Sequence, residues 1–195
     1  MSIIIVTDIF GITPALIKLS DKLNAKSIVD PYNGINMDFK SELEAYSYFT
    51  ENVGLDNYLA ELIKVVDETT NNSALLGFSI GASIIWRLSE KLSEQAFKKS
   101  SETLPSSKVK YAICYYGSQI RHFTTINPHF PVELIFPKTE QHFDLLKLQQ
   151  SLSNKPNVTI TNTNFYHGFM NTHSSNYNAS GYYAHLDWLC ARLDN

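Results

Sequence analysis

The sequence predicts an α/β fold in which a mostly parallel sheet of about six strands is covered by helices on both faces. Two observations predict it. Short, continuous apolar runs recur along the chain, and segments with apolar residues at helical spacing separate them. The 195 residues are 44% hydrophobic and 18% charged, which suits one domain with a sizeable core. We therefore expect residues 1–195 to form a single domain.

The predicted strands are residues 2–8, 26–30, 73–79, 109–117, 131–137 and 157–162. Helices are expected over residues 15–24, 39–67, about 81–96, roughly 141–152 and 184–193, with a polar loop over 97–108. Asp38 is a candidate N-cap for the helical segment 39–67. Ligands of parallel sheets bind at the carboxyl ends of the strands. This rule places Asp8, Ser79, Gly117 and the residues after Pro137 on one rim.

The bulk properties exclude several classes of function. A formal net charge of -3 gives no reason to expect nucleic-acid binding. The apolar run at residues 3–6 is too short to span a membrane and lacks the basic lead-in of a signal peptide. Cys114 and Cys190 form neither a disulfide framework nor a metal-ligand pattern. We expect a reduced, cytoplasmic protein with a small-molecule substrate, no metal or organic cofactor, no membrane partner, and the possibility of a homodimer.

A serine between two glycines stands where a predicted strand gives way to a predicted helix, in the sequence GFSIG at residues 77–81. A nucleophile elbow has this pattern, because its serine sits on a strained strand-to-helix turn where flanking side chains would clash. The structural alternative is a glycine-rich turn in which Ser79 only caps the helix. The strand before it and the apolar helix after it favour Ser79 as a nucleophile.

A serine nucleophile needs a base to accept its proton. In folds that carry a nucleophile elbow, the serine comes first along the chain, followed by the acid and then the histidine. His167 is the best placed of the six histidines, because it lies just past the strand at 157–162 on the predicted rim. His173, in the same loop, is the nearest rival, whereas His185 falls within the last helix and is expected to be structural.

The base in turn needs an acid that orients it. Glu140 follows the strand at 131–137, where a loop could turn its carboxylate back towards the histidine. Asp144 competes for this role, but we expect it one turn inside the helix that begins near residue 141. A structural alternative for Glu140 is a carboxylate that interacts with the N-terminus of that helix.

An oxyanion hole needs two backbone N–H groups aimed at the developing negative charge. Ile80, directly after the serine, is expected to supply one. The turn after the first strand is expected to supply the other from Ile9. Side chains at the same rim, those of Asp8, Phe10 and Tyr116, are predicted to contact the substrate.

These residues, taken together, resemble the dienelactone hydrolase family of α/β-hydrolases. The resemblance runs from residue 3 to about residue 190 and is carried by VTDIFGITPALIKLSDKLN, VDPYNG, GFSIGAS, YAICYYGSQI, PVELIFPKTEQHF and YHGFMN, in that order. It implies a single α/β-hydrolase domain in which Ser79, Glu140 and His167 match the nucleophile, acid and base. It also implies that Ile9 and Ile80 match the oxyanion donors.

The chain departs from the family in four respects. Serine replaces the nucleophilic cysteine of the namesake enzymes, and Glu140 stands where the family usually has aspartate. The namesake enzymes hold the lactone's carboxylate with arginines, and none of Arg87, Arg121 and Arg192 maps onto such a clamp. The chain also starts at what would be a central strand of the family, so the sheet is expected to be smaller than usual.

The predicted function is therefore that of a serine hydrolase that cleaves a small carboxylic ester, thioester or lactone through an acyl-enzyme on Ser79. Aromatic residues within 31–58 and 165–183 would suit an apolar acyl or alkyl group. One alternative is a hydrolase-like binding or regulatory protein with an impaired triad. Another is a Mg²⁺-dependent phosphatase using Asp8, although that chemistry wants a second aspartate where Phe10 stands.

Overall fold

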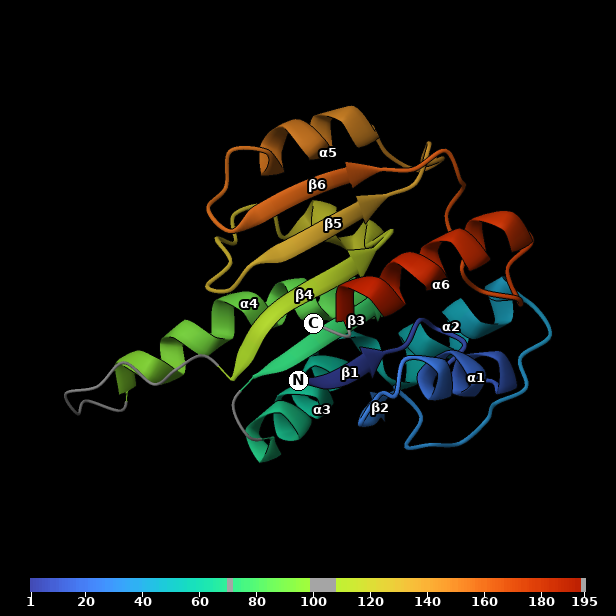
Figure 1. Cartoon of the computed structure of the whole chain (residues 1–195), viewed down its shortest axis with the longest axis horizontal. Helices are drawn as coiled ribbons and strands as arrows, with labels where there is room; N and C mark the ends of the chain where they lie inside the picture. Colours follow the sequence, from blue (N-terminus) through green and yellow to red (C-terminus); the bar gives the residue numbers. More distant parts are fainter. Residues whose placement is uncertain (70–71, 99–107, 194–195) are drawn as a thin grey trace.

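The computed structural model describes residues 1–69, 72–98 and 108–193, and these residues form one six-stranded sheet with parallel pairing throughout (Figure 1). The strand order across the sheet is β2-β1-β3-β4-β5-β6. The strands are β1 Ser2–Val6, β2 Ser27–Val29, β3 Ser73–Phe78, β4 Val109–Tyr115, β5 Val132–Phe136 and β6 Val158–Asn162. The predicted fold class and all six predicted strands are confirmed.

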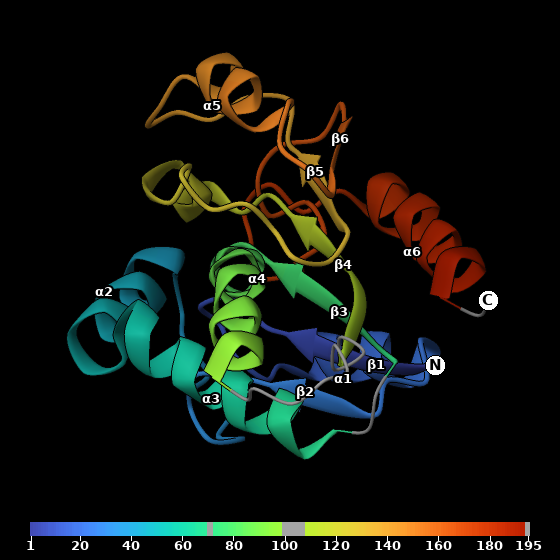
Figure 2. The same ribbon diagram turned by 90° about the vertical axis from the view of Figure 1, so that its left-hand side faces the viewer.

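Helices cover both faces of this sheet (Figure 2). They are α1 Pro14–Lys22, α2 Glu42–Asn52, α3 Gly54–Glu68, α4 Ile80–Lys98, α5 Leu145–Leu152 and α6 Ala179–Leu193. Buried side chains of α2, α3, α4 and α5 share one apolar core, and those of α1 and α6 share the other. Among the described helices, none is long and apolar enough to span a bilayer.

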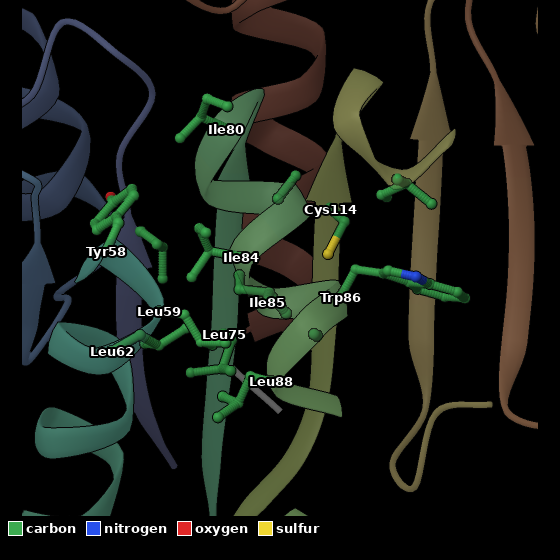
Figure 3. Packing of buried hydrophobic residues seen from close by; sticks show 14 of the residues in the cluster. Tyr58, Leu59, Leu62, Leu75, Ile80, Ile84, Ile85, Trp86, Leu88 and Cys114 are labelled. Atoms are coloured by element: carbon green, nitrogen blue, oxygen red, sulfur yellow. The ribbon is translucent and has the colours of Figure 1, made fainter. Parts of the chain in front are cut away.

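The central strands supply side chains to both cores, which explains their unbroken apolar sequences. In β1, Ile4 belongs to the core under α3 and α4, whereas Ile3 and Ile5 belong to the core under α1 and α6. Figure 3 shows the first core, where Leu59 and Leu62 of α3 lie beside β3 and α4. This packing fixes α4, which begins directly after the candidate nucleophile Ser79, against the middle of the sheet.

Two expectations about the helical region 39–67 are corrected. It is two helices, because the chain turns at Gly54, whose φ of +74° lies in the left-handed region that favours glycine. The N-cap of α2 is Ser41, whose Oγ accepts from the Glu44 N–H at 3.1 Å. Asp38 lies outside the helix, with a φ of 52°, so its predicted capping role is wrong.

The segment after β5 also differs from the prediction. Helix α5 begins at Leu145 and not near residue 141, because Asp144 is its N-cap and accepts from the Lys147 N–H at 3.1 Å. A 3₁₀ turn, η1 (Ser118–His122), follows β4 and was not predicted. Of the polar loop expected over 97–108, residues 99–107 lie outside the described residues.

Candidate active site

Ser79 occupies a tight turn between β3 and α4. Its φ of 50° is positive, a conformation that costs a residue other than glycine about 1–2 kcal/mol. Its N–H donates to the Tyr115 carbonyl of β4 at 2.9 Å, so the neighbouring strand holds the turn in place. A non-glycine residue kept in this region is typical of functional sites, and the turn has the strand-to-helix context predicted from the sequence.

The two flanking glycines are required by close contacts. A Cβ added at Gly77 would lie 2.6 Å from Cδ1 of Ile85 and 2.8 Å from the Ala82 backbone. A Cβ added at Gly81 would come closer than 3.0 Å to the carbonyl oxygens of Val6 and Thr7. The glycines therefore let β3, the first turn of α4 and the end of β1 approach each other more closely than any side chain would permit.

The three side chains of the predicted triad come together. Oγ of Ser79 lies 3.0 Å from Nε2 of His167, and Nδ1 of His167 lies 2.8 Å from Oε1 of Glu140. The Glu140 side chain is only 8% exposed and that of His167 is 22% exposed. A buried carboxylate on one imidazole nitrogen and a hydroxyl on the other is the arrangement that can activate a serine.

The rival residues occupy other places. Asp144 caps α5, and the ring of His173 packs on Phe10 with a centroid separation of 5.4 Å. His185 lies in α6, where Nδ1 is 3.0 Å from the Tyr115 hydroxyl. Burial lowers the pKa of His185 below its ordinary value, which favours the neutral ring expected of a structural histidine.

The turn after β1 sets the direction of the Ile9 N–H. The Asp8 carbonyl, in the same peptide unit, accepts from the Gly11 N–H at 3.1 Å and from Oγ1 of Thr7 at 3.0 Å. Because the peptide is trans, the Ile9 N–H points away from these donors. Ile9 lines the same cleft as Ser79 and Ile80. Ile80 is the first residue of α4, and the N–H groups at the start of a helix have no intrahelical acceptor.

A cleft of about 850 Å³ opens over Ser79 at the carboxyl ends of the strands. The arrowheads of β1, β4 and β5 in Figure 1 point to this edge. The cleft is lined by Ile9, Glu42, Leu43, Tyr46, Ser79, Ile80, Ser118, Gln119, Arg121, Thr139, Glu140, Gln141, His142, Phe143, Tyr166, His167, Ser175 and Asn176. It is therefore built from α2 and from the segments that follow β1, β3, β4, β5 and β6.

Few of the aromatic residues noted in the sequence reach this cleft. Tyr46 and Tyr166 line it and are 46% and 51% exposed, whereas Tyr32 and Tyr58 are buried in the core. Leu43 of α2 lines it as well and is 76% exposed. Tyr46 was among the aromatic residues expected from the sequence, whereas Leu43 was not, because the side of α2 that faces the cleft depends on how the helix packs.

Arg121 is a cleft residue that sequence reasoning did not place. Its Nη1 donates to the Ser118 carbonyl at 2.8 Å, and its Cζ lies 5.0 Å from the centroid of the Phe143 ring. This places one guanidinium in the wall of the cleft. Its position follows from the unpredicted 3₁₀ turn after β4, so no signal in the sequence marked it.

None of the three predicted substrate contacts lines the cleft. Phe10 is buried, and Tyr116 is buried with its ring centroid 4.9 Å from that of His167. Asp8 and Tyr116 border a separate hollow of about 30 Å³. Burial raises the pKa of the Asp8 carboxyl, although hydrogen bonds from Phe10 and Asn171 oppose the shift. Their contact with a substrate stays a prediction.

The phosphatase alternative finds no support in the surroundings of Asp8. Its carboxylate accepts from the Phe10 N–H at 2.9 Å and from the Asn171 amide at 2.6 Å. Within the described part of the chain, no group of three or more histidine, cysteine, aspartate or glutamate side chains could hold a metal ion. One or two carboxylates commonly hold magnesium, but both oxygens of Asp8 already accept hydrogen bonds from protein donors.

The sheet order and the position of the serine turn are those of the α/β-hydrolase fold. No family model matches the chain. The uncharacterized protein YczH of Bacillus subtilis (strain 168) is 28% identical to it over 193 residues, which cover 94% of this chain and 88% of YczH.

Solved structures that share the fold include dienelactone hydrolase-like proteins. A candidate dienelactone hydrolase from Klebsiella pneumoniae superposes with a TM-score of 0.73 at 15% identity, covering 99% of this chain and 86% of that one. A dienelactone hydrolase from Anabaena variabilis gives a TM-score of 0.62 at 13% identity, covering 98% and 84%. A dienelactone hydrolase-like promiscuous phosphotriesterase from metagenomic libraries gives 0.63 at 11% identity, covering 99% and 85%. The fold predicted from the resemblance is thus confirmed.

Proposed function

We propose that this protein is a serine hydrolase that cleaves a small carboxylic ester, thioester or lactone through an acyl-enzyme on Ser79. The observation that carries the proposal is the line of hydrogen-bonding atoms from Ser79 through His167 to Glu140 at the base of the cleft. The fold shared with hydrolases supports it, among them solved fungal esterases from Rhizomucor miehei.

The proposed reaction uses each group in turn. His167 takes the proton of the Ser79 hydroxyl through Nε2 as Oγ attacks the carbonyl carbon, and Glu140 stabilises the resulting imidazolium at Nδ1. The N–H groups of Ile9 and Ile80 bind the oxyanion. The imidazolium then protonates the leaving group as its bond to the acyl carbon breaks. Water attacks the acyl-enzyme in the same way, and Ser79 regains its proton.

The walls of the cleft indicate the kind of acyl or leaving group. Three exposed apolar side chains, Leu43, Tyr46 and Tyr166, converge on it, and exposed side chains of this kind favour an apolar substrate group. The impaired-triad alternative would be favoured by a Glu140 turned away from His167. The 2.8 Å distance between Nδ1 of His167 and Oε1 of Glu140 argues against that alternative.

The test is labelling by a fluorophosphonate probe, with mass spectrometry to locate the adduct. We expect the wild-type protein to be labelled on Ser79 and Ser79→Ala to be unlabelled. His167→Ala and Glu140→Gln should label about 10³-fold more slowly, because the serine loses its base or the base loses its orientation.

Two variants of rival residues serve as controls. Asp144→Asn keeps the capping oxygen of α5 and should label at the wild-type rate. His173→Ala removes a ring that packs on Phe10 and should still be labelled on Ser79. A folded wild-type protein that gives no adduct would refute the proposal. Labelling that depends on Asp144 or His173 would reassign the acid or the base.

A further inference from the structure

Two loops bring the reacting groups to the candidate site from opposite ends of the chain. The oxyanion loop, residues 7–11, carries the Ile9 N–H, and the histidine loop, residues 163–178, carries His167. A side-chain hydrogen bond joins them, from Nδ2 of Asn171 to Oδ2 of Asp8 at 2.6 Å, across 163 positions of sequence.

In the oxyanion loop, Asp8 holds the turn that contains Ile9. The other oxygen of its carboxylate, Oδ1, accepts from the Phe10 N–H at 2.9 Å. On the far side of the same turn, the hydroxyl of Tyr32 donates to the Ile9 carbonyl at 2.6 Å. Hydrogen bonds to Asp8 and Tyr32 therefore fix the turn that contains Ile9, the proposed oxyanion donor.

In the histidine loop, Asn171 is itself firmly oriented. Its N–H donates to the carbonyl of Gly168, the residue after His167, at 2.8 Å. Its Oδ1 accepts from the His173 N–H at 2.8 Å, so the amide nitrogen is the group left to face Asp8. A shift of Asn171 would thus move the backbone next to the base.

This contact matters because Asp8 is buried. Burial raises the pKa of Asp8, whereas the hydrogen bonds from Phe10 and Asn171 and the charge of His167 lower that pKa. The negative charge of Glu42 on α2 also raises the pKa of Asp8, and the phenols of Tyr32, Tyr58 and Tyr116 lie within the field of the Asp8 carboxylate. A buried carboxylate depends on its few donors, so the loss of one is costly.

We propose that Asp8 and Asn171 form a positioning pair that fixes the oxyanion loop and the histidine loop relative to each other. The pair thereby fixes both the distance of the oxyanion donor from Ser79 and the distance of the general base from Ser79. This inference rests on the proposed hydrolase function and adds two residues that do not line the cleft. A misplacement of about 1 Å costs on the order of 10²-fold in rate, and loss of one oxyanion donor costs about 10²–10³-fold.

The test is an exchange of the two side chains. Asp8→Asn and Asn171→Asp each break the pair, and the double variant restores a donor–acceptor contact with the roles reversed. In the double variant the new amide oxygen at position 8 can still accept from Phe10, and the new carboxylate at position 171 can still accept from His173. Each single variant should label with fluorophosphonate about 10–100-fold more slowly than wild type, and the double variant should recover most of the loss.

A pH profile separates positioning from a general loss of structure. In Asn171→Asp two carboxylates face each other and share one proton at low pH, which restores a bridge between the loops. Both ionise at higher pH and repel, so the labelling rate relative to wild type should fall as pH rises. Asn171→Ala brings no second carboxylate to Asp8, so it should be slow without this fall in relative rate as pH rises.

The matched control is Asn57→Asp, the same chemical change at an exposed amide in the first turn of α3. It should label at the wild-type rate, and all variants are assayed well below their melting temperatures. Hydrolysis of p-nitrophenyl butyrate should show the loss in kcat with KM little changed, because the misplaced groups act in the transition state.

Wild-type rates in Asn171→Ala, or a double variant no faster than the slower single one, would overturn the positioning pair while leaving Ser79 labelling intact. No adduct on Ser79 in either the wild type or the Asn57→Asp control would instead refute the proposed function. The two failures are therefore distinguishable.

Discussion

At the scale of single residues, glycine at position 81 does more than permit a turn. Gly81 lies in the first turn of α4, against the carbonyl groups of Val6, the last residue of β1, and of Thr7. In an exposed helix interior, alanine would be more stable than glycine by about 1 kcal/mol. Here a Cβ would come closer than 3.0 Å to two backbone oxygens, which cannot move aside as a side chain can.

We therefore expect Gly81→Ala to lower the free energy of unfolding by about 3 kcal/mol or more, against the helix propensity. The measurement is equilibrium unfolding in urea. Gly54→Ala is the control, because its Cβ would meet nothing within 4 Å and only its φ of +74° is unfavourable. That variant should lose about 1–2 kcal/mol. A Gly81→Ala protein as stable as wild type would contradict the close approach of β1 to α4.

The predicted nucleophile, acid and base could be placed from the sequence because each follows a recognisable strand. The strands at 73–79, 131–137 and 157–162 fix which loops meet at the rim, and each loop offers few suitable side chains. The partners of Asp8 could not be predicted in this way. Asn171 reaches Asp8 through a turn whose hydrogen bonds have no period in the sequence.

At the scale of elements, α2 forms one wall of the cleft while contributing little to the core. Ala45 and Phe49 are its buried residues, whereas Leu43 and Tyr46 are exposed in the wall. A helix that exposes apolar side chains beside a candidate nucleophile is positioned to contact the apolar part of a substrate.

Leu43→Ala and Tyr46→Ala should therefore affect substrate choice and not stability. We expect the kcat/KM ratio of p-nitrophenyl butyrate to p-nitrophenyl acetate to fall by roughly 3–10-fold in each, because apolar contact area is lost. Melting temperatures should stay near the wild-type value. Leu146→Ala, an exposed leucine on α5 outside the cleft, is the control and should leave the ratio unchanged. Equal ratios in all variants would remove α2 from the substrate site.

Element boundaries were predicted where apolar periodicity was strong and missed where a local contact decides them. The strands and the helix after Ser79 follow from continuous or periodic apolar residues. The break at Gly54 and the late start of α5 depend on a backbone angle and on a cap. Arg121 was left unplaced for the same reason, since it belongs to a short 3₁₀ turn.

At the scale of the whole molecule, one sheet separates two cores that share their strands. Trp86 of α4 lies in one core, and Trp188 of α6 packs against the other. The chain contains two tryptophans, so Trp86→Phe and Trp188→Phe each leave one fluorescent reporter, on opposite faces of the sheet. Because β1, β3 and β4 supply buried side chains to both cores, neither core can lose its packing without exposing the strands of the other.

This architecture predicts that the described residues unfold as one cooperative unit. In each single-tryptophan variant, urea unfolding followed by fluorescence should coincide with unfolding followed by far-ultraviolet circular dichroism. Trp86→Phe should have the lower midpoint of the two, since Trp86 is fully buried and its indole donates to the Phe123 carbonyl at 2.9 Å. Fluorescence of Trp188 that changes before the circular dichroism signal would show that α6 detaches alone. The histidine loop precedes α6 directly, so early detachment would also remove His167 from Ser79 before the sheet unfolds.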